Sequence, residues 1–483
     1  MLKLSIGGIA LLLSACAVGP NYVRPDTPTA VNFGNLNTSV YSADDSLEKF
    51  WTQFGDATLD RLVGDALAAN HDLRIAAARF RQARAERGES RLDLAPTITA
   101  GGGYTEQRFA RDQRLPGTPA ETKLYDAGFD AFWELDFFGR VRRGVEAANA
   151  EVGAAEANLR DAQTIVIAEV ARTYFELRGA QSELAVAHLN VDNQSGTVQL
   201  TRARLDAGRG TELDTARAQA QLNSTLATIG PLEAAVARAI HRLSVLTGRE
   251  PSALSAALSP VQELPSLPQI VAVGNPADLL RRRPDIRVAE RGLAASTARI
   301  GVAIADLFPK VTFTGSVGYA AAHSNELSDA GTGTRLIAPG ISWAAFDIGR
   351  VRARIAGARA RNDESLAAYE QTVLRALEET EDALVTHSRT REQLEYLARS
   401  EQASRTAAKL ARARYDGGVV DFLEVLDAER TLLLAQDSLA RSRTETATSL
   451  IAVYKALGGG WEGVPAPVTA KAQLTTTAAP SRR

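Results

Sequence analysis

Gly139-Arg140-Val141-Arg142 opens the stretch of sequence that decides the fold of this 483-residue chain, and Arg204-Leu205-Asp206-Ala207-Gly208 closes it. A twin stretch opens with Gly349-Arg350-Val351-Arg352 and closes with Arg414-Tyr415-Asp416-Gly417-Gly418, 210 positions later (349 − 139). Both stretches lack proline and are rich in residues that favour helices. Each predicts a helix of about 100 Å, at about 1.5 Å per residue. Few globular domains need so long a helix.

The first residues have the pattern of an export signal. Lys3 precedes a short apolar run over residues 6–13, and Leu13-Ser14-Ala15-Cys16 carries the small residues of a cleavage site. Cys16 is the only cysteine of the chain, so it has no internal disulfide partner. We expect residues 1–15 to be a signal peptide and Cys16 to carry a covalent lipid at the start of an extended segment, 16–55. The alternative is an ordinary signal peptide with an incidental cysteine.

The composition excludes several classes of protein. A formal net charge of −2 leaves no basic footprint for nucleic acid. A hydrophobic content of 45% is typical of a folded chain rather than a disordered one. Beyond the signal there is no run of about 20 apolar residues, so the sequence predicts no transmembrane helix.

Residues 97–135 predict a β-hairpin, because the period of the pattern changes from 3.6 to 2 after Pro96. An antiparallel strand over a soluble core has the same alternation, but this hairpin recurs at 310–346 in a chain with an expected lipid anchor. We therefore expect strands of transmembrane length with the apolar face outward and the acidic face inward. The clearest alternation sets Tyr125, Ala127, Phe129, Ala131, Trp133 and Leu135 against Asp126, Asp130 and Glu134.

The chain reads as two copies of one unit. Repeat 1, residues 56–250, predicts a helix from Asp56 to Leu94, the first hairpin, a long helix at 139–207 and a return helix at 211–247, interrupted at Gly230-Pro231. Residues 251–277 hold five prolines and predict an equatorial linker. Repeat 2, residues 278–458, predicts a helix, the hairpin 310–346, a long helix at 349–417 and a return helix at 420–457. Residues 459–483 predict a flexible tail.

Four strands cannot close a barrel. Open edges inside a bilayer would leave backbone groups unpaired, at a cost of several kcal/mol each. Identical chains would therefore have to share one barrel, with two, three or four copies supplying eight, twelve or sixteen strands.

Several motifs carry a resemblance. They are Pro20-Asn21-Tyr22-Val23-Arg24-Pro25, Arg282-Arg283-Pro284-Asp285-Ile286-Arg287, Phe308-Pro309, and the pair Phe138-Gly139-Arg140 and Ile348-Gly349-Arg350. The chain resembles the TolC-like outer-membrane efflux channels, lipoprotein branch, over residues 20–458. The resemblance implies a mainly α fold with transmembrane β: a homotrimer with a periplasmic α-barrel and a shared 12-stranded β-barrel, four strands per chain, built on an internal two-fold repeat.

The resemblance also implies a function. Such a chain would be the passive exit duct of a tripartite efflux pump for drugs or other small molecules, lipid-anchored in the outer membrane of a Gram-negative bacterium and extending into the periplasm. Its partners would be a periplasmic adaptor (membrane fusion) protein and an inner-membrane RND-type transporter. Two alternatives stay open: the outer-membrane channel of a type I secretion system, and a structural lipoprotein that spans the periplasm and conducts nothing.

The resemblance assigns roles to the two helix reversals. The adaptor would dock at tips that contain Arg204, Gly208, Gly210, Arg414 and Gly418, and the candidates for a periplasmic gate are Asp214, Asp421, Leu213 and Leu423. In a trimer each aspartate would become three like charges that attract cations. The alternative is that these carboxylates cap helices for local reasons.

No pattern of a catalytic or metal site stands out. The five histidines are scattered, and the chain has no Gly-x-Ser-x-Gly, phosphate-binding loop or Cys-x-x-Cys motif. We expect no enzymatic activity, no metal and no cofactor other than the covalent lipid on Cys16.

Overall fold

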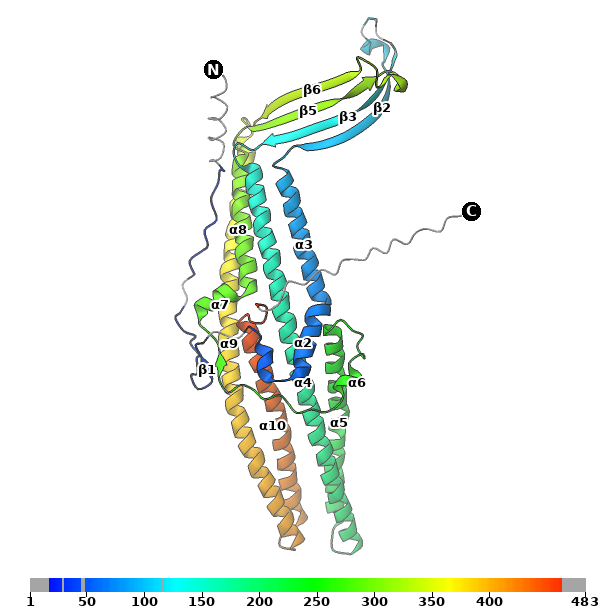
Figure 1. Cartoon of the computed structure of the whole chain (residues 1–483). Helices are drawn as coiled ribbons and strands as arrows, with labels where there is room; N and C mark the ends of the chain where they lie inside the picture. Colours follow the sequence, from blue (N-terminus) through cyan, green and yellow to red (C-terminus); the bar gives the residue numbers. More distant parts are fainter. Residues whose placement is uncertain (1–16, 28–29, 45–47, 115, 118, 463–483) are drawn as a thin grey trace, which may run out of the picture. The chain divides into compact units, whose positions relative to one another are not determined.

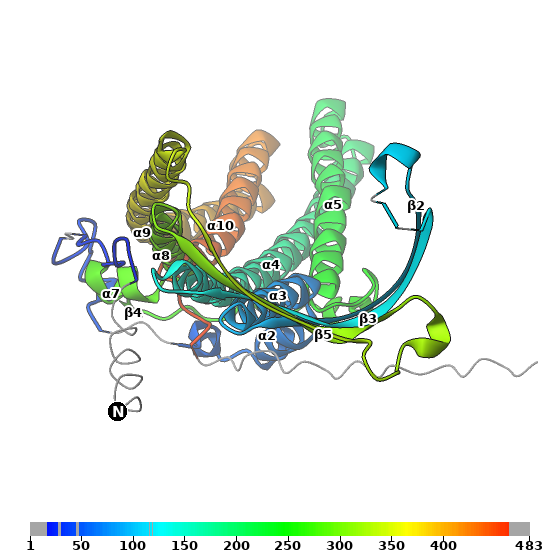
Figure 2. The ribbon, with the colours of Figure 1, turned by 90° about the horizontal axis from the view of Figure 1, so that it is seen from above.

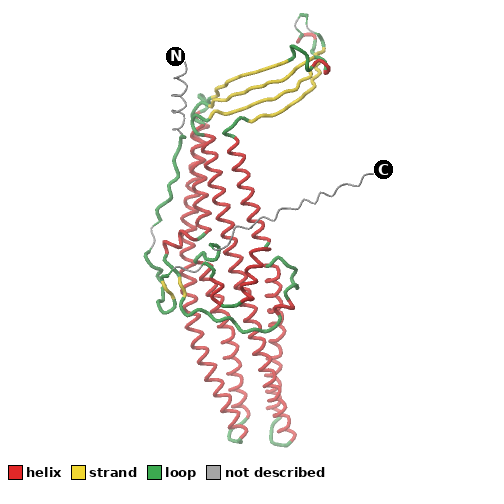
Figure 3. Tube along the Cα trace, in the orientation of Figure 1, coloured by secondary structure: helices red, strands yellow, loops and turns green. Residues whose placement is uncertain are grey.

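A computed structural model describes residues 17–27, 30–44, 48–114, 116–117 and 119–462. The expected signal peptide, Cys16 and residues 463–483 of the expected tail lie outside these residues. The chain divides into two compact units, both dominated by helices (Figure 3). Unit 1 comprises Met1–Thr27, Arg79–Ala157 and Asp285–Thr372, and unit 2 comprises Pro28–Ala78, Asn158–Pro284 and Val373–Arg483.

Unit 1 contains one antiparallel sheet in the order β2-β3-β5-β6 (Figure 1). β2 (Thr97–Arg108) and β3 (Glu121–Leu135) form the first hairpin, β5 (Lys310–Ala321) and β6 (Gly333–Ser342) the second, and β3 pairs with β5. Short 3-10 turns, η2 (Arg111–Gln113) and η3 (Ser324–Glu326), lie in the two connections. Pro339 lies in β6, an edge strand of the chain's sheet, where a residue without a backbone N–H is tolerated.

The pairing of the strands keeps the two predicted faces separate. Phe129 pairs with Ala100 and with Val317, so apolar side chains of neighbouring strands share one face. Asp130 pairs with Thr99 and Ser316 on the other face. Seen from above, the four strands bend together (Figure 2).

A row of glycines crosses the sheet. Gly101, Gly128 and Gly318 are paired in register. A Cβ atom on Gly128 would lie 2.7 Å from the main-chain oxygen of Val317, and one on Gly318 would lie 2.5 Å from that of Ala127. Only glycine allows β3 and β5 to approach so closely at this point.

Residues 17–24 are fastened to the helices of unit 1. Arg143 lies near the start of α4 (Arg140–Asp206) and is buried, with 3% of its surface exposed. Its guanidinium donates to the main-chain oxygens of Val18 and Gly19, each at 3.1 Å. It also donates to Oδ1 of Asn21 at 2.8 Å. Gly19 lies so close to Gly301 of α8 (Pro284–Ala305) that a Cβ on Gly19 would be 2.5 Å from the Cα of Gly301. The extended lead-in is therefore a packed strap.

The largest apolar core lies in unit 2. α2 (Ala57–Ala69), α5 (Glu212–Leu246), α10 (Phe422–Ala456) and the unit 2 parts of α4 and of α9 (Ile348–Asp416) contribute to it, together with η1 (Phe50–Phe54). Aromatic rings make specific contacts there: Phe50 stacks on Tyr454 at 4.7 Å between ring centroids, and Phe54 meets Phe175 edge-on at 4.9 Å.

The proline-rich segment 251–277 is part of unit 2 and contains secondary structure of its own. It contains α6 (Ser255–Leu258), β4 (Val271–Ala272) and the start of α7 (Pro276–Arg282), and β4 pairs in parallel with β1 (Tyr41–Ser42). Arg178 of α4, 1% exposed, holds the segment by donating to the main-chain oxygen of Pro260 at 3.1 Å and to Oε1 of Gln262 at 2.7 Å.

The prediction of one helix from Asp56 to Leu94 is wrong, because the chain breaks at Asn70 into α2 and α3 (His71–Leu92). Asn70 is extended, with ψ at 133°, and its Oδ1 accepts from the amides of Asp72 and Leu73, so it ends one helix and caps the next. In the second repeat Arg283 is extended, with ψ at 120°, between α7 and α8. Pro284 follows it and disfavours the helical conformation of the preceding residue. Different chemistry thus makes the same break in both repeats.

The predicted interruption at Gly230-Pro231 is also wrong, since α5 continues through Pro231. A proline removes one backbone hydrogen bond, and the remaining bonds of this 35-residue helix, which packs into the core near its C-terminal end, keep α5 helical there. The long helices expected at 139–207 and 349–417 correspond to α4 and α9, and those expected at 211–247 and 420–457 to α5 and α10.

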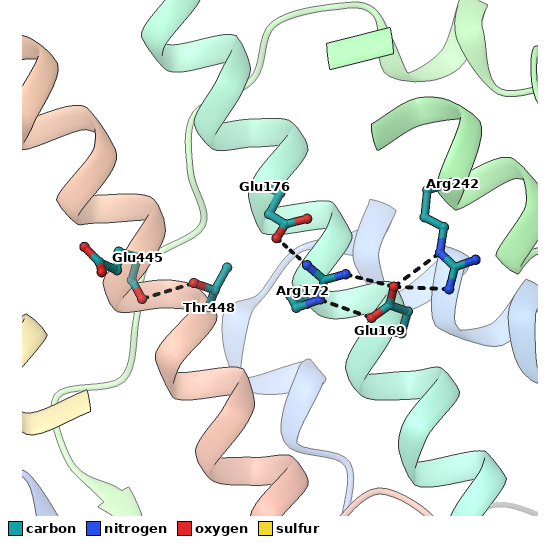
Figure 4. A network of polar contacts seen from close by, with 6 residues as sticks. All are labelled: Glu169, Arg172, Glu176, Arg242, Glu445 and Thr448. Atoms are coloured by element: carbon teal, nitrogen blue, oxygen red, sulfur yellow. Dashed lines mark hydrogen bonds and ion pairs between the residues drawn. The ribbon is translucent and has the colours of Figure 1, made fainter. Parts of the chain in front are cut away.

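Ion pairs join α4 to α5 near the C-terminal end of α5 (Figure 4). Glu169 accepts from Arg172 on its own helix at 2.8 Å and from Arg242 on α5 at 3.2 Å, and Arg172 also pairs with Glu176. Burial of Glu169 acts to raise the pKa of its carboxyl, but the two arginines outweigh burial and hold that pKa below its ordinary value.

Figure 4 also shows a hydrogen bond within α10, in which the hydroxyl of Thr448 donates to the main-chain oxygen of Glu445.

Candidate functional site: the tips of the helical hairpins

Each long helix ends in a tight reversal closed by glycine. Gly208 has φ of +69° and Gly418 has φ of +71°, the left-handed conformation that favours glycine. At the first tip the amide of Gly208 donates to the oxygen of Leu205, and that of Arg209 to the oxygen of Arg204. The second tip repeats both bonds at Gly418 and Val419. These are the two bonds of the Schellman motif, which satisfies the last carbonyls of a helix.

Gly210 is needed for a different reason. Its φ is not positive, but a Cβ there would lie 3.1 Å from the amide nitrogen of Leu205 and 3.3 Å from the Cβ of Arg204. The chain after the reversal therefore returns close to the last turn of α4.

The two candidate gate aspartates lie at different positions of their helices. Asp214 is the third residue of α5 and forms a capping box: its Oδ2 accepts from the amide of Thr211 at 3.2 Å, while the Thr211 hydroxyl accepts from the amide of Asp214 at 3.1 Å. Asp421 is itself the N-cap of α10 and accepts from the amide of Glu424 at 3.3 Å. Both carboxylates thus support helix starts, and their part in a gate stays a prediction.

Apolar side chains stand exposed beside these caps. Leu213 is 58% exposed and Leu423 is 50% exposed, and the repeat places them at equivalent positions. Both tips thus present an apolar side chain to solvent at the same place in the repeat.

The two hairpins touch through a small apolar cluster within unit 2. It consists of Val198, Ala218, Ala411, Tyr415, Phe422 and Val425, drawn from all four helices. The guanidinium of Arg204 lies over the ring of Tyr415 at 3.9 Å from its centroid, a cation–π contact between α4 and α9. Arg414, by contrast, donates to Oε1 of Glu424 at 2.8 Å and ties α9 only to α10.

A polar tie links the same hairpins a little further from the tips. Arg412 of α9 donates to the hydroxyl of Thr197 on α4 at 2.9 Å and to Oε1 of Glu429 on α10 at 3.0 Å. Burial raises the pKa of Glu429, and Arg412 opposes this increase. Separation of the hairpins would break the bond to Thr197.

Sequence reasoning missed Thr197, Arg412, Tyr415 and Glu429. One signal was available at Tyr415: it replaces Leu205 where the two closing motifs otherwise match closely, so an aromatic ring is present on one tip alone. Thr197 and Glu429 carry no local signal, because their roles depend on a contact between segments more than 200 residues apart.

The part of the chain that the structure describes contains no group of three His, Cys, Asp or Glu side chains that could hold a metal ion. None of the helices in this part is both long enough and apolar enough to cross a membrane.

Comparison with known proteins decides the family. The sequence profile described as "Outer membrane efflux protein" matches residues 62–249 and 275–459, which include both repeats and both tips. The chain belongs to the outer membrane efflux protein family. This confirms the resemblance to TolC-like channels drawn from the sequence motifs.

Individual members of the outer membrane efflux protein family support the assignment. The chain is 34% identical to outer membrane protein OprJ of Pseudomonas aeruginosa over 457 residues, which cover 94% of this chain and 95% of OprJ. It is 30% identical to the cation efflux system protein CusC of Escherichia coli over 459 residues, 94% of this chain and 98% of CusC. Among solved structures, the outer-membrane channel OprN superposes with a TM-score of 0.86 at 43% identity, covering 92% of this chain and 100% of that one.

Proposed function

We propose that this chain is the outer-membrane channel of a tripartite efflux pump and works as a passive exit duct for drugs or other small molecules. Family membership over both repeats is the observation that carries the proposal. The relatives' names support it further: besides CusC, they include "Antibiotic efflux pump outer membrane protein ArpC" of Pseudomonas putida, 33% identical over 466 residues.

The working form in this proposal is a homotrimer. β2 and β6 are the edge strands of the chain's sheet, and exposed edges call for pairing with another chain. Pairing of β6 of one copy with β2 of the next would close a shared sheet of twelve strands. Apolar side chains on one face and acidic ones on the other support lipid outside and water inside.

The tips are the proposed periplasmic end. The exposed Leu213 and Leu423 would face an adaptor or a neighbouring copy, and an inner-membrane RND-type transporter would deliver the exported molecule through that adaptor. The contacts Arg204–Tyr415 and Arg412–Thr197 would hold the hairpins together in a closed state and yield when the channel opens. A covalent lipid on Cys16 would add an anchor, and the proposal assigns no catalytic activity and no other cofactor.

The test uses the full chain purified in mild detergent. Native mass spectrometry should give a trimer, and insertion into planar lipid bilayers should give discrete conductance steps. Deletion of the gene should make cells hypersensitive to drugs, and the intact gene should restore resistance. A stable monomer without conductance would contradict the proposal, and conductance without any drug phenotype would favour the type I secretion alternative.

A further inference from the structure

One charged residue lies within the otherwise apolar rows of the sheet's apolar face. Arg335 of β6 pairs across the sheet with Val317, which pairs with Phe129 and through it with Ala100. The row on one side contains Ile337, and the row on the other contains Tyr319. A cation in this setting needs either an anion or a route to water.

The other charges on this face are paired with one another. Lys123 lies 3.6 Å from Glu106, and Arg108 lies 3.7 Å from Glu121. All four lie beyond Tyr104 and Tyr125, whose rings approach to 4.6 Å between centroids. Arg335 is exposed and pairs with no carboxylate of the described residues. Its charge therefore remains available to an anion from outside the chain.

A hollow lies beside Arg335 on the sheet. Its volume is about 740 Å³, and its lining combines Arg335 with apolar residues, among them Ala127, Phe129, Val317 and Tyr319. Gly101, Gly128 and Gly318 contribute backbone without side chains to the lining. Such a hollow has room for an acyl chain, and the neighbouring guanidinium suits the oxygens of a phosphate.

We propose that this hollow binds a phosphate-bearing membrane lipid, with an acyl chain along Phe129 and Val317 and the lipid phosphate on the guanidinium of Arg335. The inference rests on the proposed function, because it requires the apolar face to meet lipid. Tyr319 lies in the row next to Arg335, and Tyr104 and Tyr125 lie in the row beyond it. This fits the placement, since tyrosine is enriched where a membrane meets water. Arg335 lies one row further from that boundary than Tyr319, and its long side chain can carry the guanidinium to the level of the lipid phosphates.

The test measures retained lipid by native mass spectrometry of the full assembly titrated with phosphatidylglycerol. Arg335→Gln should reduce retention about fivefold, the ratio expected for one arginine at a lipid surface, and Arg335→Lys should keep most of it. Arg108→Gln is the matched control, because it removes a paired, exposed arginine of the same face. Ala127→Trp should also reduce retention by filling the hollow while Arg335 stays in place. Diacylglycerol, which lacks the phosphate, should bind the wild type and Arg335→Gln equally.

Conductance and trimer content, measured on the same samples, separate this inference from the proposed function. If Arg335→Gln conducts normally and retains phosphatidylglycerol like the wild type, the lipid site is wrong while the channel stands. If it weakens the trimer without changing lipid retention, Arg335 pairs with a carboxylate of a neighbouring copy, which also overturns the site. If neither the wild type nor any variant forms a conducting assembly, the proposed function itself is wrong.

Discussion

Trp133 donates its indole Nε1–H to the main-chain oxygen of Leu94 at 3.1 Å, and the second repeat makes the same bond from Trp343 to Leu307 at 2.9 Å. In each case an aromatic residue at the end of the sheet nearest the helices satisfies a carbonyl just after a helix ends, two residues before a proline. The internal duplication thus preserves a tertiary contact as well as a pattern of elements.

Trp133→Phe and Trp343→Phe should each lower the thermal stability of the protein modestly. Phenylalanine keeps an apolar ring but loses the donor, and one neutral hydrogen bond contributes about 1 kcal/mol. Melting followed by circular dichroism in detergent measures the effect, and the double variant should show about the sum. An unchanged melting temperature in the double variant would show that the two bonds contribute nothing.

Asp421→Asn and Asp421→Ala separate the two interpretations of this residue. Asparagine retains an N-cap and removes the charge, whereas alanine removes both and should also destabilise the start of α10 by about 1 kcal/mol. A gate role predicts that both variants lose cation preference in bilayer recordings to a similar extent. If Asp421→Asn conducts and selects like the wild type, only the capping role remains.

Arg412→Ala should raise the open fraction of the channel. The substitution breaks the contact with Thr197 between the hairpins. Because water screens this contact, it stabilises the closed state by about 1 kcal/mol, which corresponds to about a fivefold change in the ratio of open to closed channels. Arg414→Ala is the matched control, because its partner Glu424 belongs to the same hairpin. Single-channel recording should show a higher open probability only for Arg412→Ala. Equal effects of the two substitutions would show that the Arg412–Thr197 contact does not stabilise the closed state.

Gly128→Val should impair assembly, while Gly101→Val in the same row should be tolerated. A side chain at Gly128 meets the backbone of β5 under 3.0 Å, whereas nothing lies within 4 Å of a Cβ at Gly101. The yield of heat-resistant trimer on gels measures the difference. Normal assembly of Gly128→Val would mean that the strands can separate there without cost.

His387 should make the protein less stable in mild acid. Burial, aided by the charge of Arg391, lowers the pKa of His387 to about 4. Because this value lies below the pKa of about 6.5 of an unfolded histidine, the stabilisation is fully present above pH 6.5 and is lost as pH falls towards 4. The slope is at most about 1.4 kcal/mol per pH unit.

Melting temperatures measured between pH 7 and pH 5 test this prediction. This range is chosen because most carboxylates titrate below it. His387→Gln should flatten the pH dependence, and His188→Gln, at an exposed position, should leave it unchanged. Parallel curves for the wild type and His387→Gln would exclude His387 as the cause.

The site was only partly visible in the sequence. The glycines of the tips could be predicted because a reversal after a long helix requires a left-handed residue, and Gly208 and Gly418 adopt that conformation. The 210-residue offset aligns Asp421 with Thr211 and Asp214 with Glu424, so the two aspartates are not equivalent, as the caps in the structure make plain.

The sequence by itself determined the internal duplication, the long helices and the alternating strands, because periodicity and the absence of proline act over neighbouring residues. The tertiary structure alone decided the break at Asn70, the strap held by Arg143 and the contact of Arg412 with Thr197. Each of these depends on which distant groups become neighbours, as when the Nδ2 of Asn70 donates to the oxygen of Leu246. No local pattern contains that information, since a buried polar group takes whichever partner the packing brings within reach.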